Sequence, residues 1–345
     1  MQLSEQSNYA VIGAGSWGTT LANLLAEKGF PVTLWVYETD LAARMQQNGI
    51  NDIYLPGFTL SQNLTYTSDL QTAVRGMQLL LFVSPSQVTR QVLQQALPDI
   101  DPHALVVCAS KGIENDSLML MSQVFEELLP TESFHRLGFL SGPSFAKEVV
   151  QGMPTAVVAA SRDLSCAEQI QEVFSTEKFR VYTHDDIIGV ELGGSMKNVI
   201  ALAAGVADGL GFGHNTRAAL ITRGLAEMTR LGLKLGGRAE TFAGLAGMGD
   251  LVLTCTGDLS RNRTVGIELG KGRKLDEILS GMQMVAEGVK TTLSAYQLAE
   301  KLMVEVPIIE QMYQILYQGK DPRQAVSDLM LRDLKAETVL AELIL

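Results

Sequence analysis

The chain has 345 residues, of which 46% are hydrophobic and 19% are charged, and its formal net charge is −11. This length exceeds one ordinary hydrophobic core and the composition excludes a disordered chain, so we expect two compact domains. The net charge argues against nucleic acid or an anionic membrane as a partner, although a few basic side chains in a cleft can still bind one small anion.

The first predicted strand, Tyr9–Ile12, leads into a glycine-rich turn and an amphipathic helix. Gly13, Gly15 and Gly18 have G-x-G-x-x-G spacing, and the helical pattern stops at Gly29. Such glycines allow a tight turn, close approach of the backbone to a pyrophosphate, and close packing of helix on strand. The pattern therefore predicts a dinucleotide-binding site.

A second β-rich run, Val32–Val36, leads to Glu38, which lies 20 residues beyond Gly18. An acidic residue at this place favours a free ribose 2′-hydroxyl, and so NAD, over a 2′-phosphate. A neighbouring basic side chain can reverse that preference.

Strand-like runs then alternate with helical stretches, which predicts an α/β fold with a doubly wound, mainly parallel Rossmann-type sheet. These runs cover residues 79–83, 104–110, 137–140, 155–160 and 179–182. Polar turns follow three of them, at residues 84–86, 111–112 and 141–144. Because ligands of open α/β sheets bind beyond the carboxyl ends of the strands, we expect these turns to share one edge with the glycine loop. Lys111 would then lie near a substrate; a solvated loop lysine is the alternative.

From Ile187 onward the pattern is mainly helical. We therefore expect a dinucleotide-binding domain at residues 1–185 and an all-α C-terminal substrate and catalytic domain at residues 186–345.

Lys197 lies in the small, apolar run Val190–Gly205, which we expect to be a helix. Gly193 and Gly194 lie four and three residues before it, so the helix face around the lysine carries almost no side chains. Helix packing explains the glycines equally well, with the lysine stem reaching solvent. A partly desolvated lysine, however, has its ammonium form disfavoured and becomes suited to proton transfer. We interpret Lys197 as a candidate catalytic residue.

The glycine-rich stretch Gly244–Gly266 contains Asp250 and the polar group at residues 260–263. The arginines and hydroxyl and amide groups of that polar group could bind an anion, or could form a solvated turn. Asp250 could orient an active-site lysine, or could serve only as a helix N-cap.

Several classes of protein are disfavoured by what the sequence does not contain. The N-terminus has no signal-peptide pattern, and no apolar run approaches the roughly 20 uninterrupted residues of a membrane span. We expect a cytoplasmic protein without an integral membrane segment. Three widely spaced cysteines and four histidines without ligand spacing predict reduced thiols and no metal.

Taken together, these motifs resemble the bacterial NAD(P)-dependent glycerol-3-phosphate dehydrogenase family over nearly the whole chain. The stretches that carry the resemblance are "AVIGAGSWGTTLA", "VSPS", "ASKG", "LSGPSFAKE", "GVELGGSMKNVIALAAGVADGLGFGHNTRAALITRGLAEM", "GMGDLVLTCTGDLSRNR" and "VAEGVKTT". The resemblance implies reversible hydride transfer between NAD(P)H and dihydroxyacetone phosphate, giving sn-glycerol 3-phosphate for glycerophospholipid synthesis.

The resemblance also implies roles for particular residues. Lys197 would be the catalytic proton donor and acceptor. The remaining substrate contacts would be Lys111, Gly142, Asp250, Ser260, Arg261 and Asn262. The cofactor contacts would be Gly13, Gly15, Ser16, Trp17, Gly18, Lys111, Ser144, Ala146, Arg261, Val285 and Glu287.

One position departs from the family pattern. Many members carry a basic residue after the second strand, where this sequence has Tyr37 followed by Glu38. Tyr37 remains a candidate cofactor contact, and the cofactor is expected to be NAD(P). A small phosphorylated substrate and a homodimer are the expected partners. Two alternatives stay open, namely an enzyme of the β-hydroxyacid dehydrogenase type and a non-catalytic nicotinamide-binding regulator.

Overall fold

The computed structural model describes residues 7–282, 286–334 and 336–337. The chain forms two compact units, the first made of residues 1–111 and 121–187, the second of residues 112–120 and 188–345. The second unit thus begins two residues after the sequence-based boundary and also includes a short strip from the first half of the chain.

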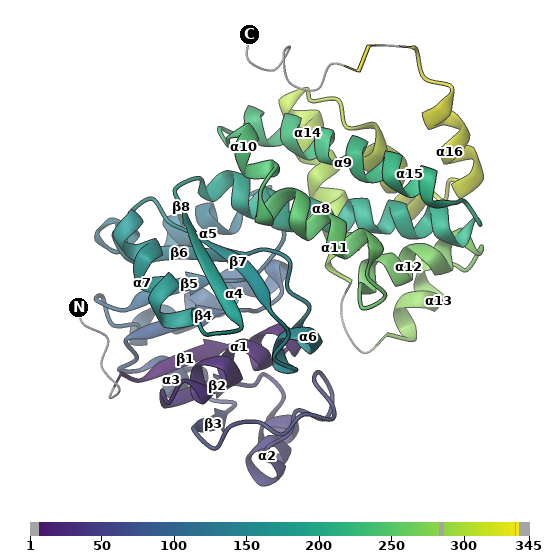
Figure 1. Cartoon of the computed structure of the whole chain (residues 1–345). Helices are drawn as coiled ribbons and strands as arrows, with labels where there is room; N and C mark the ends of the chain where they lie inside the picture. The colour runs from purple at the N-terminus through teal and green to yellow at the C-terminus, as the bar shows by residue number, and fades with distance from the viewer. Residues whose placement is uncertain (1–6, 283–285, 335, 338–345) are drawn as a thin grey trace. The chain divides into compact units, whose positions relative to one another are not determined.

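The first unit contains an eight-stranded sheet with strand order β3-β2-β1-β4-β5-β6-β7-β8 (Figure 1). Neighbouring strands pair in parallel, except that β6 and β7 are antiparallel. The strands are β1 (Tyr9–Ile12), β2 (Val32–Trp35), β3 (Leu64–Thr67), β4 (Leu79–Phe82), β5 (Leu105–Cys108), β6 (Leu137–Ser141), β7 (Thr155–Ala160) and β8 (Phe179–His184). The predicted Rossmann-type sheet is therefore confirmed.

Helices cover both faces of this sheet (Figure 1). Central strands such as β1, β4 and β5 are buried throughout, which is why they read as unbroken apolar runs in the sequence. On one face Phe82 meets Phe125 edge to face, with ring centroids 5.3 Å apart. The helices of this unit are α1 (Ser16–Glu27), α2 (Thr39–Asn48), α3 (Leu70–Val74), α4 (Ser86–Ala96), α5 (Met121–Leu128), α6 (Ala146–Val150) and α7 (Leu164–Phe174), with the short 3₁₀ turns η1 (Leu97–Asp99) and η2 (Thr131–Arg136).

The second unit is helical and is built around α8 (Ile187–Gly209). The other helices are α9 (His214–Lys234), α10 (Ala239–Phe242), α11 (Asp250–Thr256), α12 (Arg261–Gly270), α13 (Leu275–Ser280), α14 (Glu287–Leu302), α15 (Pro307–Gln318) and α16 (Pro322–Met330), and η3 (Leu245–Gly249) is a π-helical turn. The helical nature of the C-terminal region, predicted from the sequence, is confirmed.

Helix α8 is long and apolar enough by composition to cross a membrane, but 94% of its apolar window is buried inside the protein. Its side chains form the centre of the second hydrophobic core, which explains a composition that is apolar on all sides. The helix is therefore a core element of the second unit.

Candidate active site

The glycine loop between β1 and α1 has the geometry that a dinucleotide requires. Gly13 has φ +120°, and a Cβ there would lie 3.0 Å from the carbonyl carbon of Val83. A Cβ on Gly18 would lie 1.9 Å from the carbonyl oxygen of Gly13, whereas one on Gly15 would meet nothing within 4 Å. Two of the glycines therefore serve close packing, and Gly15 leaves open space beside the N-terminus of α1. That space and the free N–H groups of the helix suit a pyrophosphate.

The turns after the strands meet at the same edge of the sheet. Ser110 Oγ donates a hydrogen bond of 2.6 Å to the carbonyl oxygen of Ser84, and Lys111 Nζ donates one of 3.3 Å to that of Gly142. Gly142 has φ +138° and packs against Val157, so a side chain would be strained there. The half-buried Lys111 is thereby held on the edge that carries the glycine loop.

Other predicted cofactor positions surround the start of α1. Ser144 Oγ donates to the carbonyl oxygen of Gly142 at 3.0 Å, and the carbonyl oxygen of Ala146 accepts from Thr20 Oγ1 at 3.3 Å. Ser16 is the first residue of α1. The indole N–H of Trp17 is buried, and the described residues offer it no hydrogen-bond partner. Tyr37, after β2, is 77% exposed.

Lys197 of α8 is buried, with 8% of its surface exposed, and it forms an ion pair with the fully buried Asp250. The side chain therefore does not extend to solvent, which was the structural alternative. Asp250 opens α11, directly after η3, and its backbone carbonyl accepts a hydrogen bond of 2.6 Å from Thr254 Oγ1. A buried ammonium held by one carboxylate is a group that can donate a proton in a defined direction.

The glycines around Lys197 are explained by packing of backbone on backbone. A Cβ on Gly193 would lie 2.3 Å from the carbonyl oxygen of Ala246 in η3. Gly193 thus lets η3 approach α8 one turn before Lys197, which places Asp250 next to the lysine. The absence of a side chain at Gly193 thus allows both the contact between α8 and η3 and the ion pair between Lys197 and Asp250.

The polar group at residues 260–263 begins α12. Ser260 is the N-cap, and its Oγ accepts from the N–H of Arg263 at 3.2 Å. The Arg263 guanidinium is engaged with Asp208 at 2.8 Å and Asp258 at 2.9 Å. Arg261, by contrast, is exposed at the first position of the helix. Of the two arginines, Arg261 is the one available to a ligand anion.

Asn262 lies within the helical unit and links three helices. Its Nδ2 donates to Asn198 Oδ1 at 3.0 Å, and its Oδ1 accepts from the N–H of Gly288 at 2.9 Å. The amide thus has a structural role, and one N–H of Nδ2 remains for a substrate. Glu287, the first residue of α14, precedes this contact, whereas Val285 lies outside the described residues.

Two buried asparagines that contact the candidate site residues or the glycine loop were missed by the sequence analysis. Asn198 directly follows Lys197 and is buried with 6% exposure, and its position next to the lysine was the only available signal. Asn51 is fully buried beside the glycine loop, where its Nδ2 donates to the carbonyl oxygen of Ala14 at 2.8 Å. No local pattern marks it.

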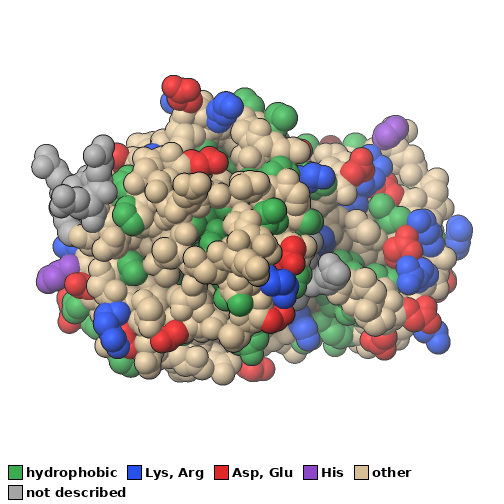
Figure 2. Space-filling view, turned by 90° about the horizontal axis from the view of Figure 1, so that it is seen from below, with side chains coloured by type: hydrophobic (Ala, Val, Ile, Leu, Met, Phe, Trp, Pro, Cys, Tyr) green, Lys and Arg blue, Asp and Glu red, His purple; other side chains and the backbone are tan. Residues whose placement is uncertain are grey.

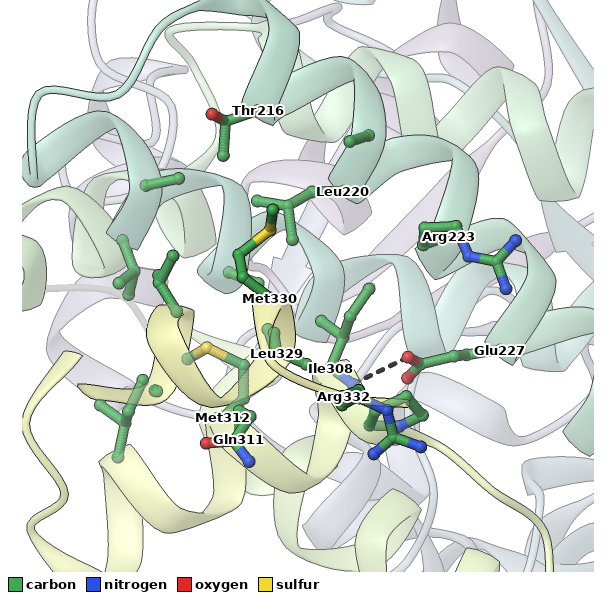
Figure 3. Close-up of a pocket in the computed structure, with 18 of the residues that line it drawn as sticks. Thr216, Leu220, Arg223, Glu227, Ile308, Gln311, Met312, Leu329, Met330 and Arg332 are labelled. Carbon is green, nitrogen blue, oxygen red and sulfur yellow. Dashed lines mark hydrogen bonds between the residues drawn. The ribbon is translucent and has the colours of Figure 1, made fainter. Parts of the chain in front are cut away.

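A separate cavity of about 460 Å³ lies in the helical unit between residues of α8, α9, α15 and α16 (Figure 3). None of the predicted site residues lines it. Its buried Glu227 accepts hydrogen bonds from the N–H groups of Ile308 at 2.7 Å and Ile309 at 3.2 Å, and so caps α15. Burial raises the pKa of Glu227 to about 7, outweighing these donors and the nearby arginines.

On the face drawn in Figure 2, acidic and basic side chains are interspersed rather than gathered by sign. Within the described part of the chain, no three His, Cys, Asp or Glu side chains form a group that could hold a metal ion.

The fold and the glycine loop together define a dinucleotide-binding protein of the Rossmann class. Comparison with known families is more specific. Residues 8–167 match the N-terminal part, and residues 186–327 the C-terminal part, of the family described as NAD-dependent glycerol-3-phosphate dehydrogenase. The chain belongs to this NAD(P)-dependent family.

Individual relatives are similar to this sequence along nearly the whole chain. The sequence is 63% identical over 330 residues to glycerol-3-phosphate dehydrogenase [NAD(P)+] of Syntrophotalea carbinolica, covering 96% of this chain and 99% of that one. It is 62% identical over 327 residues to the protein of the same name from Geobacter sulfurreducens, covering 95% and 98%. The crystal structure of glycerol-3-phosphate dehydrogenase from Coxiella burnetii superposes with a TM-score of 0.91 at 42% identity, covering 95% of this chain and 100% of that chain.

Proposed function

We propose that this chain reversibly reduces dihydroxyacetone phosphate to sn-glycerol 3-phosphate with NAD(P)H, and that Lys197 transfers the proton. The buried Lys197–Asp250 ion pair carries the proposal. Family membership supports the substrate and the cofactor.

The cofactor is proposed to bind to the sheet unit. The space beside Gly15 and the N–H groups of Ser16 and Trp17 would hold the pyrophosphate, because helix N-termini bind anions through free N–H groups. Ser144 and Ala146, whose segment contacts α1, would complete the site. When bound, the reduced nicotinamide supplies the hydride that the ketone carbon receives.

The helical unit is proposed to supply the proton and hold the phosphate. As negative charge develops on the ketone oxygen, the Lys197 ammonium donates a hydrogen bond and then its proton. Asp250 aims the ammonium by charge and hydrogen bonding. In the reverse direction the neutral amine of Lys197 accepts the proton of the C2 hydroxyl.

The phosphate end of the substrate is assigned to the N-terminus of α12. Arg261 is exposed there, and among the described residues the Ser260 side chain accepts only the N–H of Arg263, so the N–H groups of Arg261 and Asn262 remain for an anion. Binding energy from the phosphate would hold the ketone in place. Lys111 and Gly142 of the sheet unit, and Glu287 of the helical unit, are proposed as further contacts.

The test is oxidation of the reduced cofactor with dihydroxyacetone phosphate, compared between wild type, Lys197→Met and Lys234→Met. Lys234 is an exposed lysine at the end of α9 and serves as the matched control. Loss of general acid catalysis should lower kcat of Lys197→Met by about 10² to 10⁴, while its affinity for the cofactor stays unchanged. The kcat and the cofactor affinity of Lys234→Met should equal those of wild type. Full turnover of Lys197→Met would refute its role, whereas activity on a 3-hydroxy acid alone would indicate the β-hydroxyacid dehydrogenase alternative. Cofactor binding without any turnover would indicate a regulator.

The cellular role follows from the product. We propose that the chain works in the cytoplasm as a homodimer, without a metal, and supplies glycerol 3-phosphate for glycerophospholipid synthesis. A bacterial strain that lacks this activity and requires added glycerol 3-phosphate should grow without it when this chain is expressed. Sedimentation at several concentrations tests the dimer.

A further inference from the structure

Asp208, near the C-terminal end of α8, connects three helices of the second unit. Its Oδ1 accepts hydrogen bonds from the Arg217 guanidinium of α9, at 3.1 Å from Nε and 2.7 Å from Nη2. Its Oδ2 accepts one of 2.8 Å from Nε of Arg263 in α12. The side chains of Asp208, Arg217 and Arg263 are only 10%, 19% and 12% exposed. Ion pairs at this depth are weakly screened by salt and hold a defined geometry.

The backbones of α8 and α12 touch through glycines, and this contact sets how closely the two helices lie. A Cβ on Gly209 would lie 2.2 Å from the carbonyl oxygen of Ile267 and 3.0 Å from the Cα of Gly270. Most helix pairs are kept from sliding by ridges of side chains that fit into grooves of the partner. A face of glycines has no such ridges. The position of α12 along α8 therefore depends on polar side chains.

Two polar contacts tie the first turn of α12 to α8, toward opposite ends of that helix. Asn262 bonds to Asn198 at 3.0 Å, whereas Arg263 reaches Asp208, which lies ten residues and so about 15 Å further along α8. The bond between the two amides is neutral, and hydrogen bonds between ionised groups are roughly twice as strong. Without Asp208 the turn would be tied to α8 by the weaker contact alone.

The turn held in this way is the proposed phosphate site. Arg261 is its first residue and is exposed. The guanidinium of Arg263 is instead occupied by the carboxylates of Asp208 and Asp258. One arginine of the turn thus fixes the helix, and the other is available to the substrate.

We propose that Asp208, acting through Arg263, is a positioning residue that sets the place of α12 along α8 and thereby adapts the site to substrates that carry a phosphate. The inference rests on the proposed phosphate site. Loss of the carboxylate would displace the Arg261 guanidinium and the N–H groups at the start of α12 from the phosphate oxygens. The ion pair of Lys197 with Asp250 includes no residue of α12 and would remain.

Binding of dihydroxyacetone phosphate in the presence of saturating oxidised cofactor tests the proposal, because these two oxidised compounds cannot react with each other. By calorimetry, Asp208→Asn should bind dihydroxyacetone phosphate about tenfold more weakly than wild type, which corresponds to one charge-assisted hydrogen bond to the phosphate. Asp258→Asn is the matched control, since Asp258 also bonds to Arg263, at 2.9 Å, but has a side chain that is 97% exposed. Exposed ion pairs contribute little, so this variant should bind as wild type does.

A second measurement distinguishes positioning from general damage to the helical unit. With dihydroxyacetone, which lacks the phosphate, kcat/KM of Asp208→Asn should equal that of wild type. With dihydroxyacetone phosphate, kcat/KM should fall about tenfold or more, because the phosphate contacts are misplaced. Arg263→Met, which leaves Asp208 paired with Arg217, should reproduce both results.

Two outcomes would overturn the proposal. One is an Asp208→Asn variant that binds dihydroxyacetone phosphate as tightly as Asp258→Asn, and the other is an equal loss of kcat/KM with both ketones. If circular dichroism shows that Asp208→Asn does not fold, Arg263→Met is judged by the same two criteria. Because the binding measurement needs no turnover, weaker binding by Asp208→Asn in a chain that does not reduce dihydroxyacetone phosphate would refute the proposed reaction and leave this inference standing. A wild type that does not bind dihydroxyacetone phosphate would refute both.

Discussion

Gly205 of α8 and Gly266 of α12 lie directly against each other, since a Cβ on either would come within 2.9 Å of the Cα of the other. The same Cβ on Gly205 would lie 2.1 Å from the carbonyl oxygen of Arg263. The two helix backbones are therefore in contact two turns after Lys197 and one turn after Arg261. This contact fixes α12 relative to the helix that carries the lysine.

Gly205→Ala should separate the two helices. Overpacking of this kind costs about 1–3 kcal/mol in the free energy of unfolding, and the displaced α12 should raise KM for dihydroxyacetone phosphate more than KM for the cofactor. Urea unfolding and steady-state kinetics measure both effects. Gly213→Ala is the control, because a Cβ there meets nothing within 4 Å. Equal stability of the two variants would contradict the close contact.

Asp250→Asn should leave the buried Lys197 ammonium without a counter-charge. Breaking a buried pair on one side costs about 3–5 kcal/mol, whereas replacing both members by apolar groups is often nearly neutral. We therefore expect Asp250→Asn to lose both stability and turnover. The double variant Lys197→Met/Asp250→Leu should regain most of the stability while remaining inactive. A double variant as unstable as Asp250→Asn in urea would show that the pair is needed for folding as well as chemistry.

Asn262→Ala should destabilise more than Asn198→Ala. The first change removes two hydrogen bonds and leaves the N–H of Gly288 buried without its acceptor, at about 1–3 kcal/mol, while the second removes one bond. Because the two amides share a bond, the double variant should deviate from additivity by about 0.5 kcal/mol or more. Chemical unfolding of the two single variants and the double variant gives this double-mutant cycle. Strictly additive changes in the free energy of unfolding would argue against the hydrogen bond between Asn262 and Asn198.

Glu227→Gln should change the pH dependence of stability. The pKa of Glu227 is raised from 4.5 to about 7 by burial, so the folded chain holds a proton that the unfolded chain has lost between these values. The contribution of Glu227 to the free energy of unfolding is complete below pH 4.5. It falls by about 3 kcal/mol in total as the pH rises to about 7. Glu227→Gln has no carboxyl proton to lose at this position. Its free energy of unfolding should therefore rise relative to that of wild type between pH 5 and 8. Parallel unfolding curves at all pH values would contradict this.

The strands of the sheet could be predicted because burial on both faces leaves unbroken apolar runs. β1 was placed at its observed bounds, Tyr9–Ile12. β3, Leu64–Thr67, was missed because it is a partly exposed edge strand with only four residues and two threonines. The antiparallel β6–β7 pair was also beyond prediction, since apolar runs carry no strand direction.

The candidate site could be predicted where a residue type is rare in its surroundings, as with Lys197 in its apolar helix. It could not be predicted where the role depends on distant partners. Arg261 and Arg263 read alike in sequence, and only the carboxylates of Asp208 and Asp258 distinguish them. Asn51 likewise lies in an irregular loop, and its partner Ala14 is 37 residues away.

The strip at residues 112–120 belongs to the helical unit, where the N–H of Gly112 donates to Ser195 Oγ at 2.9 Å and Ser294 Oγ donates to the carbonyl oxygen of Ile113 at 3.2 Å. The gene segment that encodes the sheet therefore also encodes residues 112–120, which pack in the helical unit. A single crossover between two relatives at residue 187 would combine residues 112–120 of one parent with helices α8 and α14 of the other. Chimeras should tolerate a swap only when residues 112–120 come from the parent that provides α8 and α14, so the two units are expected to have been inherited as a matched pair.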